Sequence, residues 1–257
     1  MRDLPPALPV RVYRKLCAIS LWPTFRAYVS RIDADHPFSG FPARLVGDAS
    51  SDPSETFDHY DAFASWASKV LAAKPEGLSI LDLGSPKMMN AMLAARHRVT
   101  AIVLRDCGDP FSGVHYVVHD VADPLPFDDA SFDFFTSAAT MPLIGLGRYG
   151  DKVDATSLPR LLNEMRRVTR PAAECMISLC LGPNYLAFNN AWFFDFPTIA
   201  RLLSGWKIED FVVDRWSSPR TPHRVPARER FSKDTSLAGM GRGDYCVIIL
   251  HCKRIEC

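Results

Sequence analysis

Residues 145–151 combine glycine with side chains that bind ligands or move protons. They read Gly-Leu-Gly-Arg-Tyr-Gly-Asp, so three glycines surround a guanidinium, a phenol and a carboxylate. Glycine permits positive φ and a close approach of the backbone to a ligand. Arg148 offers planar donors to a carboxylate or phosphate. Tyr149 can stack on a substrate, and Asp151 can accept a proton from it. We therefore predict that Arg148 binds substrate and that Tyr149 and Asp151 are catalytic. In the alternative interpretation, Arg148 and Asp151 pair with each other in a structural turn.

A second stretch, residues 81–88, reads Leu-Asp-Leu-Gly-Ser-Pro-Lys-Met and follows the start of an apolar run. A glycine at a strand-to-helix turn lets a ligand approach the backbone, and the helix that follows supplies free amides. Asp82 lies beside this turn, where it either binds a ligand through water or orders the loop.

Other polar residues are spread along the chain. His119 is predicted as a catalytic base, with a structural histidine as the alternative. Asn189 is predicted to hold a sugar hydroxyl, or else to cap the helix that follows. The segment 215–233 carries six basic residues and one acid. Within it we predict that Arg220 and Arg224 bind an anionic substrate, unless the segment is a solvated loop.

Short apolar runs alternate with helical patterns and must position these residues. Strands are predicted over 79–83, 99–104, 115–118, 132–136, 175–181, 207–213 and 245–251, and helices over 56–73, 87–96, 158–168 and 195–204. This alternation indicates an α/β fold, a Rossmann-like, seven-stranded, mostly parallel, doubly wound sheet with an antiparallel C-terminal hairpin. In such sheets ligands bind at the carboxyl ends of the parallel strands.

Residues 120–133 resemble a known family segment. They match the pattern Asp-x-x-x-x-Leu-Pro-Phe-x-x-x-Ser-Phe-Asp of class I S-adenosylmethionine (SAM)-dependent methyltransferases, and residues 161–171 are similar to the helix before strand five in that family. The resemblance covers about residues 56–252. It implies SAM as the cofactor. No cluster of metal-binding residues is evident in the sequence, so no metal is expected.

The resemblance also implies a set of cofactor-binding residues. Asp82, Gly84 and Ser85 would line the cofactor, and Asp120 would lie near its adenine. The acid that the family places at the end of strand two corresponds to Val103, and Asp106 is predicted to take its place. Pro86 and Met88 stand where the family has further glycines.

A narrower resemblance rests on the Gly145–Asp151 loop and on Phe188 and Asn189 after strand five. These residues are similar to a methyltransferase-like domain family of unknown function. The resulting hypothesis is a SAM-dependent methyltransferase that transfers a methyl group to oxygen or nitrogen of a small-molecule or glycan-like acceptor. The alternative is a catalytically altered member of the fold that serves as a binding or scaffold component in glycan biosynthesis. A nicotinamide-dependent enzyme is a weaker interpretation, because Gly-x-Gly-x-x-Gly is absent after strand one.

The hydrophobic content and net charge of the chain exclude some classes of protein. The 257 residues are 47% hydrophobic and carry a net charge of +1, which disfavours a disordered chain and a nucleic-acid partner. Although the total charge is near zero, two segments are basic, residues 1–32 and 215–233, and the rest of the chain is acidic. Seven cysteines without a Cys-x-x-Cys pair predict reduced thiols.

The beginning of the sequence is polar and proline-rich, and no run approaches the length of a membrane span, so we expect a cytoplasmic protein. Residues 10–32 show helical spacing of apolar residues between basic ones. This pattern predicts a helix that packs on the domain, or one that contacts a membrane surface. We predict an N-terminal extension over residues 1–54 and a methyltransferase-like domain over residues 55–257.

Overall fold

The computed structural model describes residues 59–108, 112–187, 191–217, 227–232 and 245–255, together with Ile19, Trp22, Pro23, Arg26, Ala27 and Ser30. The chain divides into two compact units, Met1–Thr56 and Phe57–Cys257.

The second unit is built from helices on both faces of one sheet. Its helices are α2 (His59–Ala72), α3 (Lys87–Ala94), the 3-10 helix η1 (Met141–Leu143), α4 (Ser157–Val168) and α5 (Phe196–Leu202). Its strands are β1 (Ser79–Leu83), β2 (Arg98–Val103), β3 (His115–Val118), β4 (Phe132–Ser137), β5 (Thr169–Leu181), β6 (Tyr185–Ala187), β7 (Ala191–Phe194), β8 (Trp206–Ser217), β9 (Ala227–Ser232) and β10 (Tyr245–Arg254).

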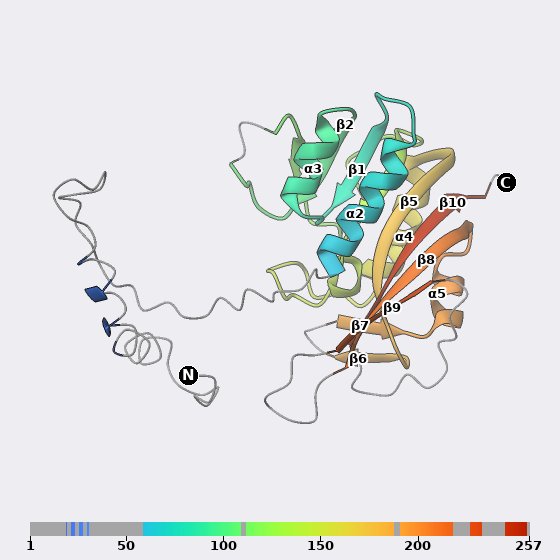
Figure 1. Cartoon of the computed structure of the whole chain (residues 1–257). Helices are drawn as coiled ribbons and strands as arrows, with labels where there is room; N and C mark the ends of the chain where they lie inside the picture. The colour runs from blue at the N-terminus through green and yellow to red at the C-terminus, as the bar shows by residue number, and fades with distance from the viewer. Residues whose placement is uncertain are drawn as a thin grey trace. The chain divides into compact units, whose positions relative to one another are not determined.

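The described strands run in the order β3-β2-β1-β4-β5-β10-β8-β9 across the sheet (Figure 1). The pairs from β3 to β5 are all parallel. Strand β10 is antiparallel to both of its neighbours, β5 and β8. The predicted fold class is therefore confirmed: the sheet is Rossmann-like, mostly parallel, and ends in antiparallel strands.

Alternating side chains on the central strands build two separate cores, because successive residues of a strand point to opposite faces. Ile80, Phe134 and Met176 pack with α2 and α3 on one face. Their neighbours Leu81, Phe135 and Ile177 pack with α4 and α5 on the other face. Helices on both faces of a parallel sheet explain why these strands are apolar along almost their whole length.

The structure differs from the sequence prediction at the C-terminal side of the sheet. Strand β10 lies between β5 and β8, and β9, which was not predicted, forms the outer strand beside β8. A small antiparallel hairpin, β6–β7, was also not predicted. Strand β7 pairs with Cys180 and Leu181 of β5, beyond Ile177, the last residue of β5 that pairs with β4.

In the first unit, Ile19, Trp22, Pro23, Arg26 and Ala27 have helical conformation. The side chains of Ile19 and Trp22 are exposed. A membrane contact of residues 10–32 stays a prediction. Among the described helices, none has the length and apolar character that a membrane span requires.

Candidate active site

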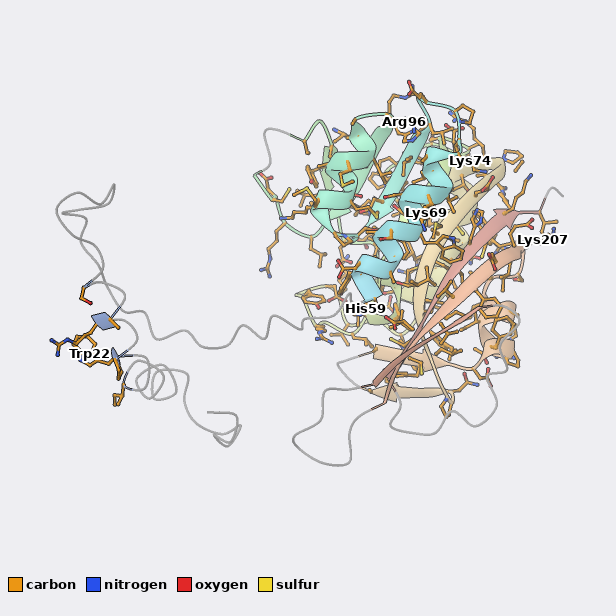
Figure 2. All side chains as sticks on the ribbon, viewed as in Figure 1. Trp22, His59, Lys69, Lys74, Arg96 and Lys207 are labelled. Carbon is orange, nitrogen blue, oxygen red and sulfur yellow. The ribbon has the colours of Figure 1, made fainter. Side chains whose placement is uncertain are left out.

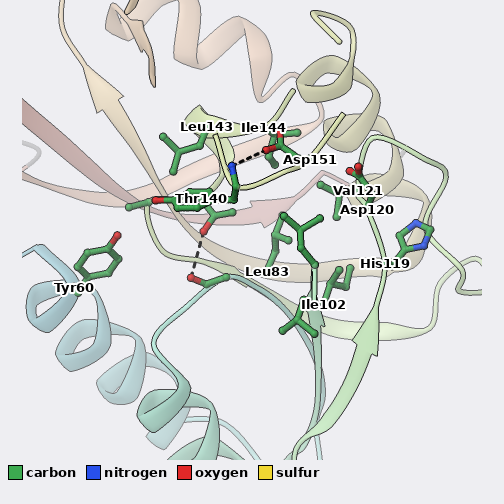
Figure 3. Close-up of a pocket in the computed structure, with 15 residues that line it drawn as sticks. Tyr60, Leu83, Ile102, His119, Asp120, Val121, Thr140, Leu143, Ile144 and Asp151 are labelled. Atoms are coloured by element: carbon green, nitrogen blue, oxygen red, sulfur yellow. Dashed lines mark hydrogen bonds between the residues drawn. The ribbon is translucent and has the colours of Figure 1, made fainter. Parts of the chain in front are cut away.

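A pocket of about 320 Å³ opens at the carboxyl ends of four parallel strands. Leu83 ends β1 and Gly84 follows it, Val103 ends β2, and residues after β3 and β4 complete the walls. The full lining is Tyr60, Leu83, Gly84, Ile102, Val103, Leu104, His119, Asp120, Val121, Ala139, Thr140, Leu143, Ile144, Tyr149 and Asp151. Tyr60 and His119 stand at opposite ends of the pocket (Figure 3). This is the edge at which doubly wound sheets bind their ligands.

Asp82 in β1, directly before the lining residues Leu83 and Gly84, organises the turn after this strand. Its Oδ2 accepts hydrogen bonds from the Ser85 backbone N–H (3.2 Å) and the Asn90 amide (2.8 Å), and its Oδ1 accepts one from the Thr136 hydroxyl (2.7 Å). Burial raises the pKa of the Asp82 carboxyl above its ordinary value, although these hydrogen bonds oppose the shift. Of the two roles considered for Asp82, the geometry supports ordering of the loop.

Small polar residues join the turn after β1 to the end of β4. The Ser137 hydroxyl donates to the Leu83 carbonyl (2.9 Å), and the Ser85 hydroxyl accepts from the Ala138 N–H (3.2 Å). The Thr140 hydroxyl donates to the Gly84 carbonyl at 3.3 Å (Figure 3). A Cβ on Gly84 would lie 2.2 Å from that hydroxyl oxygen, so Thr140 requires glycine at this position.

The Gly145–Asp151 loop folds around the Asp151 carboxylate. Asp151 Oδ2 accepts the N–H groups of Gly145 (3.0 Å) and Gly147 (3.2 Å), and its Oδ1 accepts that of Tyr149 (3.2 Å; Figure 3). Among the described residues, no ion pair joins Arg148 to Asp151. Instead, the Arg148 guanidinium lies 5.5 Å from the centre of the Tyr149 ring. The carboxylate thus receives three amides of its own loop, which leaves it poorly placed to accept a proton from a substrate.

Asp120 is also engaged by backbone amides. Its Oδ1 accepts the Ala122 N–H (2.9 Å), and its Oδ2 accepts the Lys152 N–H (3.0 Å). The neighbouring His119 has a buried Nε2 atom with no hydrogen-bond partner in the described part of the chain. A buried polar atom of this kind calls for an explanation, and a bound ligand or water would provide one.

The structure brings five of the predicted site residues to the pocket: Gly84, His119, Asp120, Tyr149 and Asp151. Three predicted cofactor residues and one predicted substrate residue are not among those that line it: Asp82, Ser85, Asp106 and Arg148. Asp106 is exposed and accepts the Gly108 N–H at 2.9 Å. Asn189, Arg220 and Arg224 lie outside the described residues.

Sequence reasoning missed most of the pocket lining. Leu143 and Ile144 come from η1 and the residue after it, Ile102 comes from β2, and Tyr60 comes from the first turn of α2. The hairpin β6–β7 supports Leu143, which packs on Phe193 and Ala191. The available signal was the position of aliphatic residues at the strand ends, but such residues also occur throughout an ordinary core.

The methyltransferase domain family matches residues 81–177 of the chain. None of the curated proteins matches. One solved structure with a similar fold is the Burkholderia thailandensis 1,6-didemethyltoxoflavin-N1-methyltransferase, bound to 1,6-didemethyltoxoflavin and S-adenosylhomocysteine. It has 14% identity and a TM-score of 0.51, and the match covers 99% of this chain and 93% of that one.

A second solved structure, a putative methyltransferase from Bacillus halodurans C-125, has 13% identity and a TM-score of 0.51, covering 74% of this chain and 98% of that one. A third, the [4+2]-cyclase SpnF, has 13% identity and a TM-score of 0.50, covering 76% and 81%. These likenesses show that the chain has the fold of class I methyltransferases. Its predicted relation to the family of unknown function stays a prediction.

Proposed function

We propose that this chain is a SAM-dependent methyltransferase that acts on a small-molecule acceptor. One observation carries the proposal: every pocket-lining residue except Tyr60 lies within residues 81–177, the segment that matches the methyltransferase domain family. The segment that resembles methyltransferases is therefore also the segment that builds the ligand site of the chain.

The chemistry of the pocket fits the base of SAM. Ile102, Leu104 and Val121 offer aliphatic surface to a planar ring, and the orphaned Nε2 of His119 lies in the same region. Pockets of several hundred Å³ with apolar walls and a few polar groups are typical small-molecule sites. SAM would supply an electrophilic methyl group on its sulfonium sulfur, and the residues of the chain would bind and orient it.

The ribose side of the pocket departs from the family pattern. Val103 ends β2 and lines the pocket, whereas Asp106 is exposed and bonded to its own loop. Among the described residues, the only carboxylates that line the pocket are Asp120 and Asp151. We infer that ribose binding depends less on a carboxylate here than in methyltransferases that carry an acid at this position.

The acceptor is proposed to bind toward the end of the pocket that holds Tyr60, and to be methylated on oxygen or nitrogen. A glycan-like, anionic acceptor is favoured by the basic segment 215–233. Because the carboxylate of Asp151 is already engaged by its own loop, we expect transfer to depend mainly on the alignment of acceptor and methyl group.

A second candidate function is a binding or scaffold protein that does not methylate. Two observations favour it. Val103 stands at the end of β2, and backbone N–H groups already donate hydrogen bonds to the carboxylates of Asp120 and Asp151. The fold does not determine the chemistry, since one protein of similar structure is a [4+2]-cyclase.

Titration calorimetry with SAM and S-adenosylhomocysteine tests the proposal. We expect saturable binding below millimolar ligand, and loss of binding in Leu104→Arg, which places a charge on the pocket wall. Leu186→Arg is a matched control, because Leu186 on β6 is 38% exposed and Leu104 is 37% exposed, but only Leu104 lines the pocket.

The absence of binding at millimolar ligand would contradict the proposed cofactor. Thermal stabilisation by nucleotide sugars or glycans, in a protein that binds neither SAM nor S-adenosylhomocysteine, would instead support the second candidate.

A further inference from the structure

The Gly145–Asp151 loop is a preformed wall of the pocket. Leu146 forms an isolated antiparallel bridge with Val153, which closes the loop at its base. Inside it, Asp151 accepts the amides of Gly145, Gly147 and Tyr149. Three amides directed at one carboxylate define a single loop conformation, and a charge-assisted hydrogen bond is about twice as strong as a neutral one.

Three further contacts tie this loop to the ends of neighbouring strands. The Arg105 guanidinium, after β2, donates to the Tyr149 carbonyl (3.3 Å). The Lys152 N–H donates to Asp120, after β3, and the Lys152 ammonium bonds both oxygens of Asp123 (2.7 and 2.6 Å). The loop that follows β4 and η1 is therefore fastened to the ends of β2 and β3, which form another wall of the same pocket.

Tyr149 lies in the middle of this fastened loop and lines the pocket, yet 56% of it is exposed. An aromatic ring that borders an aliphatic pocket and keeps an accessible surface is suited to stack on a planar ligand.

We propose that Asp151 and Asp120 are positioning residues, which hold the Gly145–Asp151 loop so that the Tyr149 ring covers the base of the bound cofactor. This inference rests on the proposed function, because it takes the adenine of SAM as the planar ligand. It changes the role predicted for two residues: Asp151 shapes the loop instead of removing a proton, and Tyr149 stacks instead of reacting.

Hydrogen exchange of the ligand-free protein tests whether Asp151 holds the loop in its conformation. In Asp151→Asn the amides of Gly145, Gly147 and Tyr149 should exchange at least tenfold faster than in the unsubstituted chain. Asp128→Asn is the control, because Asp128 is an exposed carboxylate outside the pocket lining. Unchanged exchange of these three amides in Asp151→Asn would overturn the fastening role.

Binding of S-adenosylhomocysteine tests the covering role of Tyr149. Tyr149→Phe keeps the ring and should bind within twofold of the unsubstituted chain. Tyr149→Ala and Asp151→Asn should each bind about tenfold more weakly, the order of one lost base–aromatic stack. Equal affinity of Tyr149→Ala and Tyr149→Phe would overturn the covering role.

The double variant Asp151→Asn/Tyr149→Ala separates positioning from a general structural effect. If Asp151 acts through Tyr149, the double variant should bind about as weakly as Tyr149→Ala alone, since the ring that Asp151 positions is gone. Additive losses, about a hundredfold together, would overturn the positioning role. Failure of the unsubstituted chain to bind S-adenosylhomocysteine would overturn the proposed function and the covering role with it. The exchange experiment would still decide whether Asp151 fastens the loop.

Discussion

Asp82 is a buried carboxylate whose partners all belong to the protein, which makes it a residue of structure more than of ligand binding. Asp82→Ala would leave the Asn90 amide and the Thr136 hydroxyl without their acceptor. We expect a loss of about 3 kcal/mol in the free energy of unfolding, since an unsatisfied buried polar group costs about 1–3 kcal/mol. Asp82→Asn can still accept from Ser85 and Asn90 and can donate to Thr136, so its loss should be much smaller. Urea denaturation measures both; equal losses would contradict this role.

The pKa of Asp82 adds a pH dependence of definite sign. Burial raises the pKa of its carboxyl in the folded state above the ordinary value of 3.8. The contribution of Asp82 to stability is therefore complete below pH 3.8 and falls as the pH rises through the raised value. The stability of Asp82→Asn relative to the unsubstituted chain should accordingly improve with rising pH. Urea midpoints at pH 4 and pH 8 would show the trend, and a difference that stays constant would contradict it.

Val103 offers a gain-of-function test at the end of β2. It is half-buried and lines the pocket at the position where the family carries an acid. Val103→Asp would provide an acceptor for the ribose hydroxyls, and hydrogen bonds to a charged group contribute about 1.5–3 kcal/mol. We expect S-adenosylhomocysteine to bind about tenfold or more tightly in calorimetry. Val118→Asp is the control, because exposed Val118 does not line the pocket. Weaker binding by Val103→Asp would argue against a ribose at this position.

At the scale of elements, Gly145 in the Gly145–Asp151 loop is required for close packing as well as for its backbone conformation, whereas Gly113 is required for its backbone conformation alone. Gly145 and Gly113 both have positive φ (78° and 72°). A Cβ on Gly145 would lie 2.2 Å from the Asp154 carbonyl oxygen, whereas one on Gly113 would meet nothing within 4 Å. Gly113→Ala should cost about 1 kcal/mol for its left-handed backbone, and Gly145→Ala about 3 kcal/mol because the loop must also move. Thermal or urea denaturation measures the stability of both variants. Similar losses of stability in Gly113→Ala and Gly145→Ala would contradict the close packing at Gly145.

The regular elements of the sheet could be predicted because their sequences carry the matching periodicity. Central strands such as β1 and β4 are apolar runs, and α4 places Leu158, Leu161 and Met165 on one face. The short strands β6 and β7 have no such signal, since their pairing depends on the vacant edge of β5 beyond Ile177. The position of β10 between β5 and β8 is likewise set by tertiary pairing.

The candidate site could be predicted where glycine and acidic residues stood out, and not where the walls are aliphatic. The Gly145–Asp151 loop stood out by its composition, whereas Gly84 and Asp120 were predicted from the resemblance to methyltransferases. The hydrogen bonds that backbone amides donate to Asp151 and Asp120 depend on the folded loop and could not be predicted. Ile102 and Ile144 could not be distinguished from core residues in the sequence, because aliphatic side chains form both the walls of a pocket and the interior of a domain.

At the scale of the whole molecule, one ionic cluster joins parts of the chain that are far apart in sequence. Lys74 lies two residues after α2 (Figure 2). Its ammonium and the Nε2 atom of His251 in β10 both form hydrogen bonds with the Glu174 carboxylate of β5, at 2.5 and 2.7 Å. Burial alone would raise the pKa of Glu174, but the hydrogen bonds from Lys74 and His251 outweigh it and hold this pKa below its ordinary value of 4.5. The contribution of Glu174 is therefore present above pH 4.5 and is lost as the pH falls through the lowered value.

Replacement of Glu174 tests this link between the helix layer and the sheet. Glu174→Gln should lower the free energy of unfolding by about 1–3 kcal/mol at pH 7, and the difference from the unsubstituted chain should shrink as the pH falls below 4.5. Glu76→Gln is the control, because Glu76 pairs with Arg96 on the surface and exposed pairs contribute little. Urea midpoints at pH 5, 4 and 3 decide; a difference that grows below pH 4.5 would contradict the assignment.

The insertion of β10 between β5 and β8 has a consequence for how the protein is made. A ribosome releases β5 and β8 well before residues 245–254, at about 5–20 residues per second. During those seconds the facing edges of both strands expose unpaired N–H and C=O groups, which are templates for pairing with other chains. The nascent chain is therefore most prone to aggregate between the synthesis of β8 and that of β10, when residues 79–137, which form β1 to β4, have long been made.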